Sequence, residues 1–430
     1  MAIINDNDRY LTYRYRVKTI SIDFGNGVYK KLKPEQVKSL VIINDYLNNA
    51  FPIIQLKLSI NSRLYYRILR NKDKVGFILN IRNYYIVDKK SDKSLFHEWL
   101  NEKFSLILDD SDEDLYSNLR TKNNGSNQED EELYEQANEV EFYLFKRDLI
   151  QATQPDFSCI YRYLDITSFL AITLRDNGIT NVLMSKPDNS DVYNLITIPH
   201  MKFIEALKYV DTFYGIYKTG AIIYFGITRS YIIKFDTRCT AYETGEITST
   251  TIIVPQAGSS MTQSCCAVQK AGHSNKNYII ADYETIDFTE PIITDSQING
   301  RTVIVHNTTT GKHDTATIAK NYDATELAKL QSGSSTKTIE NHGLNKFLHK
   351  EYKKIKMGLS TAVTVEFSDI DVSVLEPNKK FNFVFEDTSL SQKYNGSYIL
   401  GKSEIGMFRS TEDLNVSVRC TFYSDIGAEF

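Results

Sequence analysis

The sequence predicts an α+β, mainly β, multidomain protein, and three observations support this prediction. Apolar side chains recur at every second position near both ends of the chain, as in Val363, Val365 and Phe367, and this spacing is typical of strands with one buried face. Tyr (28) and Phe (22) are abundant whereas Pro (8) is scarce, which also favours strands. At 430 residues the chain exceeds one ordinary hydrophobic core, so about two to four domains are expected.

The composition is that of a globular protein and argues against several classes. Hydrophobic residues make up 42% and charged residues 24% of the chain, and the formal net charge is −4, so no global basic field favours nucleic-acid binding. No apolar run approaches the ~20 residues that span a bilayer. The first residues lack the basic start and apolar block of a signal peptide. We therefore expect a soluble protein that is not conventionally secreted and does not insert into a membrane.

The cysteines indicate reduced thiols in a protein made in a cytoplasm. They are odd in number and irregularly spaced, at Cys159, Cys239, Cys265, Cys266 and Cys420. Sequence neighbours such as Cys265 and Cys266 rarely bridge to each other, and no C-x-x-C spacing indicates zinc.

Residues 1–93 are expected to form an N-terminal β domain. The two-residue period runs through 13–24, returns over 54–60 and appears again over 77–81. Between the first two runs, Gly25-Asn26-Gly27 is typical of a turn. A short connector is expected near Pro34.

Residues 94–145 are expected to form a connector with an acidic flexible insertion. From Ser94 to Leu108 the pattern favours a helix or an irregular connector around Trp99, the single tryptophan. The acidic, polar tract from Asp109 to Glu132 has too few apolar residues to offset the entropy of ordering, which predicts a mobile surface loop. The tract lacks the D-x-D-x-D-G-x5-E pattern of an EF-hand, so a solvated loop is favoured over a cation site.

Residues 146–255 are expected to form a mixed helix and hairpin domain. A capping Asp165, an apolar stripe and Gly178 predict one amphipathic helix, and a second is expected from Pro199 to Val210. The strands 221–225 and 231–235 follow as a hairpin.

The last two segments are expected to be β-rich. Residues 256–340 are rich in Ser, Thr, Gly and Asn, which predicts a small β domain with hairpins at Asn299-Gly300 and Thr310-Gly311 and a linker over 331–335. Residues 341–430 are expected to begin with a short basic helix from Asn345 to Met357 and to end in a C-terminal β-meander. In that meander, Asn395-Gly396 is expected to form a tight turn.

The search for chemistry predicts no catalytic, cofactor-binding or metal site. His342 and His349 are seven positions apart, but a ligand pair needs a shorter step and a third donor. Cys265 or Cys266 with His273 would be a thiol nucleophile and its base, yet proximity in sequence is no evidence for such a pair, and an idle thiol is favoured. The sequence has no H-E-x-x-H, G-x-S-x-G, Walker A or G-x-G-x-x-G pattern, and context marks out no carboxylate pair for glycoside hydrolysis.

A family resemblance does emerge from three stretches of the chain. The strands 17–24 and 53–60, with Leu32 to Leu40 and Asp45 to Pro52 between them, resemble the opening domain of baseplate central hub proteins of contractile-tailed bacteriophages. Ile198 to Asp211 with Tyr214 to Tyr217 is similar to their helix-and-hairpin region. Tyr394 to Leu400 with the closing strand 414–422 is similar to their last barrel strands. This tail-tube-like hub family is related to late control protein D and to the N-terminal hubs of VgrG.

The resemblance implies two tail-tube-like β-barrel domains, at residues 1–93 and 341–430. It also implies a homotrimeric ring that matches the tail tube above and seats the central spike below, next to other baseplate proteins. DNA would pass through this ring without specific binding. The protein would be assembled in the host cytoplasm, reside in the tail baseplate of the virion and catalyse nothing. Some hubs of the family carry peptidoglycan-cleaving domains, but no matching motif occurs in this sequence, and the acidic insertion departs from a minimal hub.

The alternative is an all-β carbohydrate-binding or cell-wall-degrading tail protein. Tyrosines such as Tyr65, Tyr66, Tyr84 and Tyr85 would stack on sugars in such a protein. Adjacent tyrosines in a strand point to opposite faces, however, which favours a packing role. A stable trimer would favour the hub, and a glycan-binding monomer would favour the alternative. The tube protein itself is a further rival, but tube subunits need only one barrel.

Overall fold

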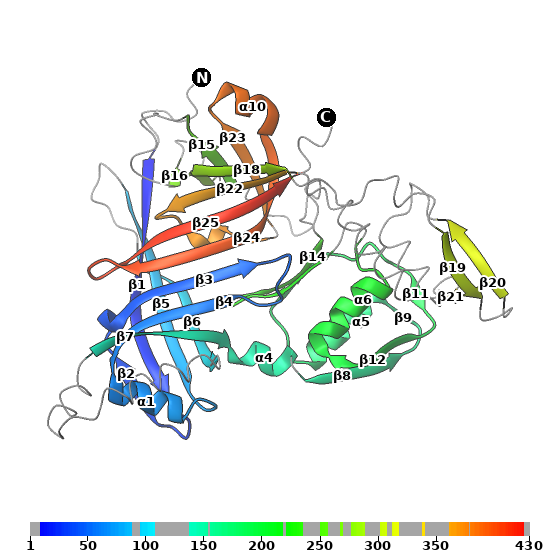
Figure 1. The fold of residues 1–430 in the computed structure, drawn as a ribbon, viewed down its shortest axis with the longest axis horizontal. Coiled ribbons are helices and arrows are strands. Elements are labelled where there is room, and N and C mark those ends of the chain that lie inside the picture. Colours follow the sequence, from blue (N-terminus) through cyan, green and yellow to red (C-terminus); the bar gives the residue numbers. More distant parts are fainter. Residues whose placement is uncertain are drawn as a thin grey trace, which may run out of the picture.

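Strands dominate the structure, a computed structural model. It describes residues 9–87, 95–107, 137–153, 155–217, 221–234, 250–256, 267–269, 277–288, 302–307, 312–317, 338–339, 361–377 and 379–424. Most of the strands belong to one 15-stranded sheet that takes in both terminal regions (Figure 1). The mainly β class predicted from the sequence is thus confirmed.

The large sheet draws its strands from two separate parts of the chain. The first part supplies β1 (Arg9–Asp23), β2 (Tyr29–Leu32), β3 (Val37–Asp45), β4 (Ile53–Asn61), β5 (Gly76–Val87), β6 (His97–Ile107) and β7 (Ala137–Lys146). The second part supplies β15 (Thr250–Val254), β16 (Ala267–Gln269), β17 (Asn277–Ile280), β18 (Asp282–Phe288), β22 (Thr361–Ser368), β23 (Lys380–Phe385), β24 (Gly396–Arg409) and β25 (Leu414–Ser424).

Strands from both parts form a closed ring of pairings. The ring runs from β1 through β5, β6, β7, β4, β3, β24 and β25 and returns to β1, where Tyr15 faces Leu414. The contact between β1 and the second part is extended by the Tyr13 N–H, which donates to the Asp369 carbonyl at 2.8 Å. Strands expected in separate terminal domains therefore pair within one sheet, and the two-barrel arrangement is not confirmed.

The strand β24 is shared between two regions of the sheet. Its first residues pair with β23, up to Ile399 opposite Lys380, and its later residues pair with β3, from Lys402 opposite Asp45. The register with β25 shifts between Leu400 and Lys402, so Gly401 lies at the change of partner. A Cβ atom there would lie 2.3 Å from the Tyr423 ring, and glycine permits this close approach.

The two-residue period predicted for both terminal regions is confirmed. Along β4 and β25 buried and more exposed residues alternate, because successive side chains of a strand point to opposite faces. The turn predicted at Gly25-Asn26-Gly27 is also present, with positive φ at all three residues. The connector near Pro34 is the short 3-10 helix η1 (Pro34–Gln36).

A mixed α/β region lies beside the large sheet (Figure 1). Its helices are α4 (Arg147–Thr153), α5 (Ile166–Asp176) and α6 (Phe203–Phe213). Its strands are β8 (Asp156–Tyr161), β9 (Leu164–Asp165), β10 (Val182–Met184), β11 (Val192–Tyr193), β12 (Ile196–Lys202), β13 (Ala221–Phe225) and β14 (Ser230–Lys234). The predicted hairpin is confirmed, because β13 and β14 pair antiparallel.

The helix predicted after Asp165 is confirmed as α5. The Asp165 side chain accepts a hydrogen bond from the Ser168 N–H at 2.9 Å, and Gly178 has a φ of 74° just beyond the helix. The buried stripe includes Phe169 and Leu174. Both ends and the packed face therefore follow from residues visible in the sequence.

Replacing Asp165 with alanine is expected to lower the free energy of unfolding by about 1 kcal/mol. The variant leaves the Ser168 N–H without its side-chain acceptor, whereas Asp165→Asn retains an oxygen at that place and is expected to change stability by a few tenths of a kcal/mol. Urea unfolding followed by circular dichroism measures both variants. An unchanged midpoint in Asp165→Ala would show that the cap contributes nothing.

The second predicted helix begins later than expected. The segment from Ile196 to Lys202 is the strand β12, which pairs with β8, and α6 starts only at Phe203. The register with β8 shifts between Ile198 and Met201, around Pro199. Proline lacks an N–H and is tolerated where a ladder is interrupted, so Pro199 marks a strand irregularity and not a helix start.

The prediction of a helix or irregular connector from Ser94 to Leu108 is wrong for its described part. That part contains β6, which pairs with β5 and β7. Ile81 pairs with Leu100, but the next residue, Arg82, pairs with Glu98. Trp99 is therefore skipped by the pairing and forms a bulge. The extra residue changes the phase of the alternation, which hides the strand period in the sequence.

The C-terminal segment is not a simple meander. β22 pairs with β25 and β18, and not with β23. The helix α10 (Thr388–Tyr394) stands between β23 and β24, and Asn395 ends this helix while its side chain accepts the Phe385 N–H at 2.8 Å. The expected tight turn at Asn395-Gly396 is therefore a junction between a helix and a strand.

The remaining described elements are small. They are α1 (Ser62–Arg70), η3 (Val372–Val374), and a three-stranded sheet of β19 (Thr302–Asn307), β20 (Lys312–Thr317) and β21 (Thr338–Ile339). The acidic tract, the linker over 331–335 and the basic helix expected from Asn345 to Met357 lie outside the described residues.

Candidate functional site

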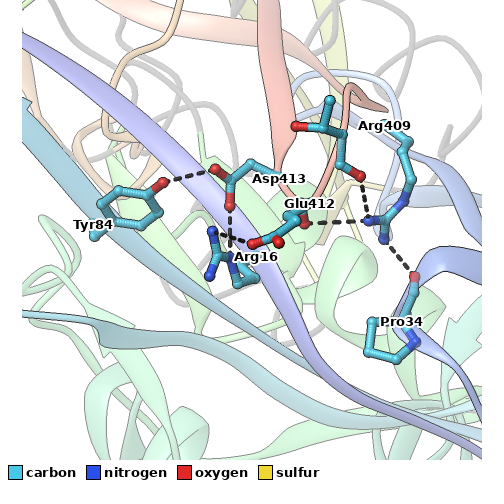
Figure 2. Close-up of polar contacts among 7 residues, drawn as sticks. Arg16, Pro34, Tyr84, Arg409, Glu412 and Asp413 are labelled. Atoms are coloured by element: carbon cyan, nitrogen blue, oxygen red, sulfur yellow. Dashed lines mark hydrogen bonds and ion pairs between the residues drawn. The ribbon is translucent and has the colours of Figure 1, made fainter.

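The turn between β24 and β25, residues 410–413, is fixed to the N-terminal strands by charged side chains (Figure 2). Arg409 donates hydrogen bonds to the carbonyls of Pro34 and Val37, the latter at 2.7 Å. It also donates to the carbonyls of Thr411 and Glu412, at 3.3 and 3.2 Å. One guanidinium thus links η1 and β3 to the β24–β25 turn.

Asp413 forms the second half of this junction. Its carboxylate accepts hydrogen bonds from Arg16 Nε on β1 and from the Tyr84 hydroxyl on β5, each at 2.7 Å. Burial alone would raise the pKa of Asp413, but the hydrogen bonds from Arg16 and Tyr84 hold it below its ordinary value. We call Arg16, Tyr84, Arg409 and Asp413 the ring clasp. They hold the closed ring together where β25 returns to β1.

A pocket of about 580 Å³ lies between the closed ring, the β13–β14 hairpin and the segment around η3. Three hydrogen bonds organise its floor. The Tyr224 hydroxyl donates to Asn44 Oδ1 at 2.7 Å, and Asn44 Nδ2 donates to Ser403 Oγ at 3.0 Å. The Tyr231 hydroxyl donates to Glu376 Oε1 at 3.1 Å. The hairpin is thereby tied to the ring on one side and to the segment following η3 on the other.

Aromatic rings line much of this pocket. Tyr13 and Tyr85 lie 5.6 Å apart between ring centroids, and Tyr46 and Tyr224 lie 4.6 Å apart. Trp99 also lines it. Burial raises the pKa of Tyr13, Tyr46 and Tyr224, so these phenols stay protonated, and that of Tyr224 donates to Asn44 Oδ1.

The pocket has a polar rim. His97, Glu98, Thr228, Arg229 and Ser373 are exposed residues of its lining. In the floor, Tyr224 and Tyr231 are buried, whereas Asn44 and Glu376 are half-buried. A solvent-accessible mouth above a largely buried floor is the usual form of a small-molecule site.

Most of the weighed cysteine and histidine candidates lie outside the described residues, namely Cys265, Cys266, His273, His342 and His349. Within the described part of the chain, no group of three His, Cys, Asp or Glu side chains could hold a metal ion. The described cysteines are not activated, because burial raises the pKa of Cys159 to about 11 and that of Cys420 as well.

The structure separates the tyrosines weighed as sugar-stacking residues. Tyr65 and Tyr66 lie on the helix α1, so their assumed strand setting is wrong. Tyr84 and Tyr85 do lie in a strand. Tyr84 is buried and bonds Asp413, whereas Tyr85 is half-buried and packs on Tyr13.

The ring clasp and the pocket floor were missed by the sequence reasoning. Arg409 and Pro34 are separated by 375 positions, and Tyr224 and Asn44 by 180. No local spacing signals such pairs. Of the residues gathered there, the sequence had singled out Trp99 as the single tryptophan and Tyr84 and Tyr85 as candidates for stacking on sugars.

No helix in the described portion is long and apolar enough to cross a membrane.

Comparison with known proteins identifies a bacteriophage protein. Residues 16–419 match the model of one family, described as the Bacteriophage PBS1 gene 109 protein. The match covers most of the chain, so the protein belongs to this family, and the recognition of a bacteriophage protein is confirmed. No curated protein matches the sequence.

The chain is also similar to several solved structures. A tail protein from Neisseria meningitidis MC58 has 8% identity and a TM-score of 0.42, with 96% of this chain and 97% of that chain covered. The 43 kDa tail protein of prophage MuSo2 from Shewanella oneidensis has 8% identity and a TM-score of 0.40, with 94% and 97% covered. A type VI secretion component from E. coli, described as structurally similar to the T4 tail proteins gp27 and gp5, has 6% identity and a TM-score of 0.38, with 96% and 76% covered.

Proposed function

We propose that this phage protein is a structural component of the tail baseplate, a hub that joins the central spike to the tail tube and adapts their symmetry. It acts as a homotrimer, contacts the tube protein, the spike protein and other baseplate proteins, and catalyses nothing. Membership in a bacteriophage family and the resemblance of the sequence to baseplate hubs support this proposal. One structural observation carries it further, namely the single sheet that joins both terminal regions.

The continuous sheet suits a protein that transmits geometry. β24 has β25 on one side and β23 followed by β3 on the other, so the strand is paired on both sides over much of its length. At the end of the sheet path, β18 has β22 as its one partner among the described strands, and β2 has β1. Strand edges of this kind must be protected or covered, and a closed ring of copies would cover them symmetrically.

A passage for DNA fits the charge of the chain. The formal net charge is −4, and a channel that passes DNA must avoid strong phosphate contacts, because these would slow transit. The ring of three copies would thus enclose the path of the genome and would not bind DNA specifically. In this proposal the protein is assembled in the host cytoplasm and resides in the virion tail.

The oligomeric state tests the hub. Light scattering during size-exclusion chromatography of the full chain is expected to give three times the chain mass of 49.4 kDa. Mixing with the tail tube and central spike proteins encoded by the same phage is expected to give a larger complex. A monomer that binds neither protein would overturn the proposal.

A further inference from the structure

The pocket between the closed ring and the β13–β14 hairpin is not needed for the proposed hub, yet it has the features of a binding site. Its volume of about 580 Å³ lies within the range of small-molecule pockets. Strands from both parts of the large sheet and the hairpin all contribute to its walls. Three tertiary units thus converge on one cavity.

Asn83 provides the first sign of a missing partner. It is 9% exposed, lines the pocket, and its Oδ1 atom is buried without a hydrogen-bond partner. Its cross-strand neighbours are Tyr15 on β1 and His97 on β6. Buried amide oxygens are rarely left unpaired in proteins, because desolvation without a hydrogen bond is unfavourable. The atom has less than 1 Å² of accessible surface, so a ligand hydroxyl or N–H in the pocket reaches it only if a neighbouring side chain of the lining moves.

The aromatic walls define the second requirement. Tyr13 and Tyr85 pack together, Trp99 packs edge-on against Tyr15 with centroids 5.3 Å apart, and all but Tyr15 line the pocket. Such rings offer flat apolar faces to a ligand that has an apolar face of its own.

The charged groups of the lining define the third requirement. Glu98, Asp371 and Glu376 are carboxylate acceptors, and they disfavour an anionic ligand. Arg229 lies at the same rim and disfavours a cationic one. All three carboxylates also have protein partners. Asn80 Nδ2 donates to Glu98 at 2.8 Å, the Ser373 N–H donates to Asp371 at 3.1 Å, and Lys379 pairs with Glu376 at 3.1 Å. A neutral ligand rich in hydroxyl donors meets all these conditions.

We infer that the pocket binds a neutral saccharide of one or two sugar rings. The apolar face of a sugar ring packs on Tyr85 and Trp99, and hydroxyl groups donate to the carboxylates of the lining. A shift of a lining side chain is needed before a hydroxyl can also donate to Asn83 Oδ1. Binding at this site requires no catalysis. The inference is independent of the hub proposal. A trimer that binds no sugar would contradict only the inference, and a monomer that binds sugar would contradict only the hub proposal.

The single tryptophan makes the inference directly testable. Trp99 is the only tryptophan of the chain and lines the pocket, so its fluorescence reports on ligands there. The full chain is titrated with glucose, N-acetylglucosamine, cellobiose and chitobiose, and with tetramethylammonium chloride as a cationic probe. At least one sugar is expected to change the Trp99 emission in a saturable manner, whereas the cation is expected to leave it unchanged.

Variants assign the signal to the pocket. Tyr85→Ala is expected to weaken sugar binding about tenfold or more, which corresponds to ~1.4 kcal/mol. Tyr143→Ala removes a tyrosine that is 41% exposed on β7 outside the pocket lining and is expected to leave affinity unchanged. Trp99→Phe keeps an aromatic wall, and its sugar affinity, measured by calorimetry, is expected to stay within a few-fold of the parent. Thermal unfolding checks that each variant is folded.

Three results would overturn the inference: no response to any of the four sugars at millimolar concentration, saturable binding of tetramethylammonium instead, or sugar binding that folded Tyr85→Ala leaves unchanged.

Discussion

Replacing Phe422 with alanine is expected to lower the free energy of unfolding by about 3–5 kcal/mol. The side chain is fully buried on β25. Its ring centroid lies 4.9 Å from that of Phe381, 5.1 Å from Phe383 and 6.4 Å from Phe367. Truncation loses the transfer free energy of the ring and leaves a cavity among three other rings that are fixed by their own strands. Urea unfolding of the full chain, followed by far-ultraviolet circular dichroism, measures the shift.

Phe408 provides the matched control. It lies on the neighbouring strand β24, pairs with Asn415 of β25 and is 50% exposed. Its ring covers the backbone of Gly406, where an added Cβ would lie 2.6 Å from it. Phe408→Ala is therefore expected to cost less than about 1 kcal/mol. If both variants shifted the transition equally, the aromatic cluster around Phe422 would have no special role in the core.

Strand positions were predictable because their signal is local. The alternation through Val363, Val365 and Phe367 follows from the opposite faces of a single strand, and each of these three side chains is buried in β22. The helix α5 was predictable for a similar reason, since Asp165 and Gly178 mark its two ends within the sequence. These features need no knowledge of the rest of the fold.

Pairing partners were not predictable because their cause is not local. β3 and β24 meet although more than 350 positions separate them, as in Asn44 and Ser403. Half-buried strands with similar periods are interchangeable as far as sequence alone is concerned. The expected division into separate terminal domains was based on the order of the strands in the sequence. In the structure, the sheet is defined by which strands hydrogen-bond to each other, and these come from both terminal regions.

Local irregularities also concealed parts of the candidate site. The bulge at Trp99 removed the strand period of β6, and that same bulge contributes a ring to the pocket. Asn83 follows Arg82 and precedes Tyr84 in β5, and nothing in that sequence context marks it. Its importance depends on an unpaired Oδ1 atom, a property that exists only once the strands are assembled.

Removing the carboxylate of the ring clasp is the second large effect expected. Asp413→Ala is expected to lower the free energy of unfolding by about 2–3 kcal/mol near neutral pH. The variant leaves Arg16 Nε and the Tyr84 hydroxyl without the acceptor that each now has at 2.7 Å. These two donors come from β1 and β5, so the loss falls where β25 closes the ring (Figure 2). The midpoint of urea unfolding measures the change.

Glu412 is a stringent control for this effect. It is the adjacent acid and faces the same Arg16, with an N···O distance of 3.2 Å, but its side chain is 80% exposed. Exposed ion pairs contribute little because water and salt screen them. Glu412→Gln is therefore expected to change stability by less than about 0.5 kcal/mol. Equal losses in both variants would mean that net charge, and not the half-buried hydrogen bonds of Asp413, holds the turn.

The pH dependence separates the two explanations further. The pKa of Asp413 is lower in the folded protein than its ordinary value of 3.8, so the unfolded chain takes up the proton first as the pH falls. The contribution of the carboxylate is therefore fully present above about pH 5, declines as the pH falls past the ordinary value, and is lost once the pH has dropped through the lower folded pKa. The difference in unfolding free energy between the parent and Asp413→Asn is accordingly expected to be constant from neutral pH to about pH 5 and to shrink at lower pH. A difference that stays constant down to pH 2 would show that the ionised carboxylate does not hold β25 against β1.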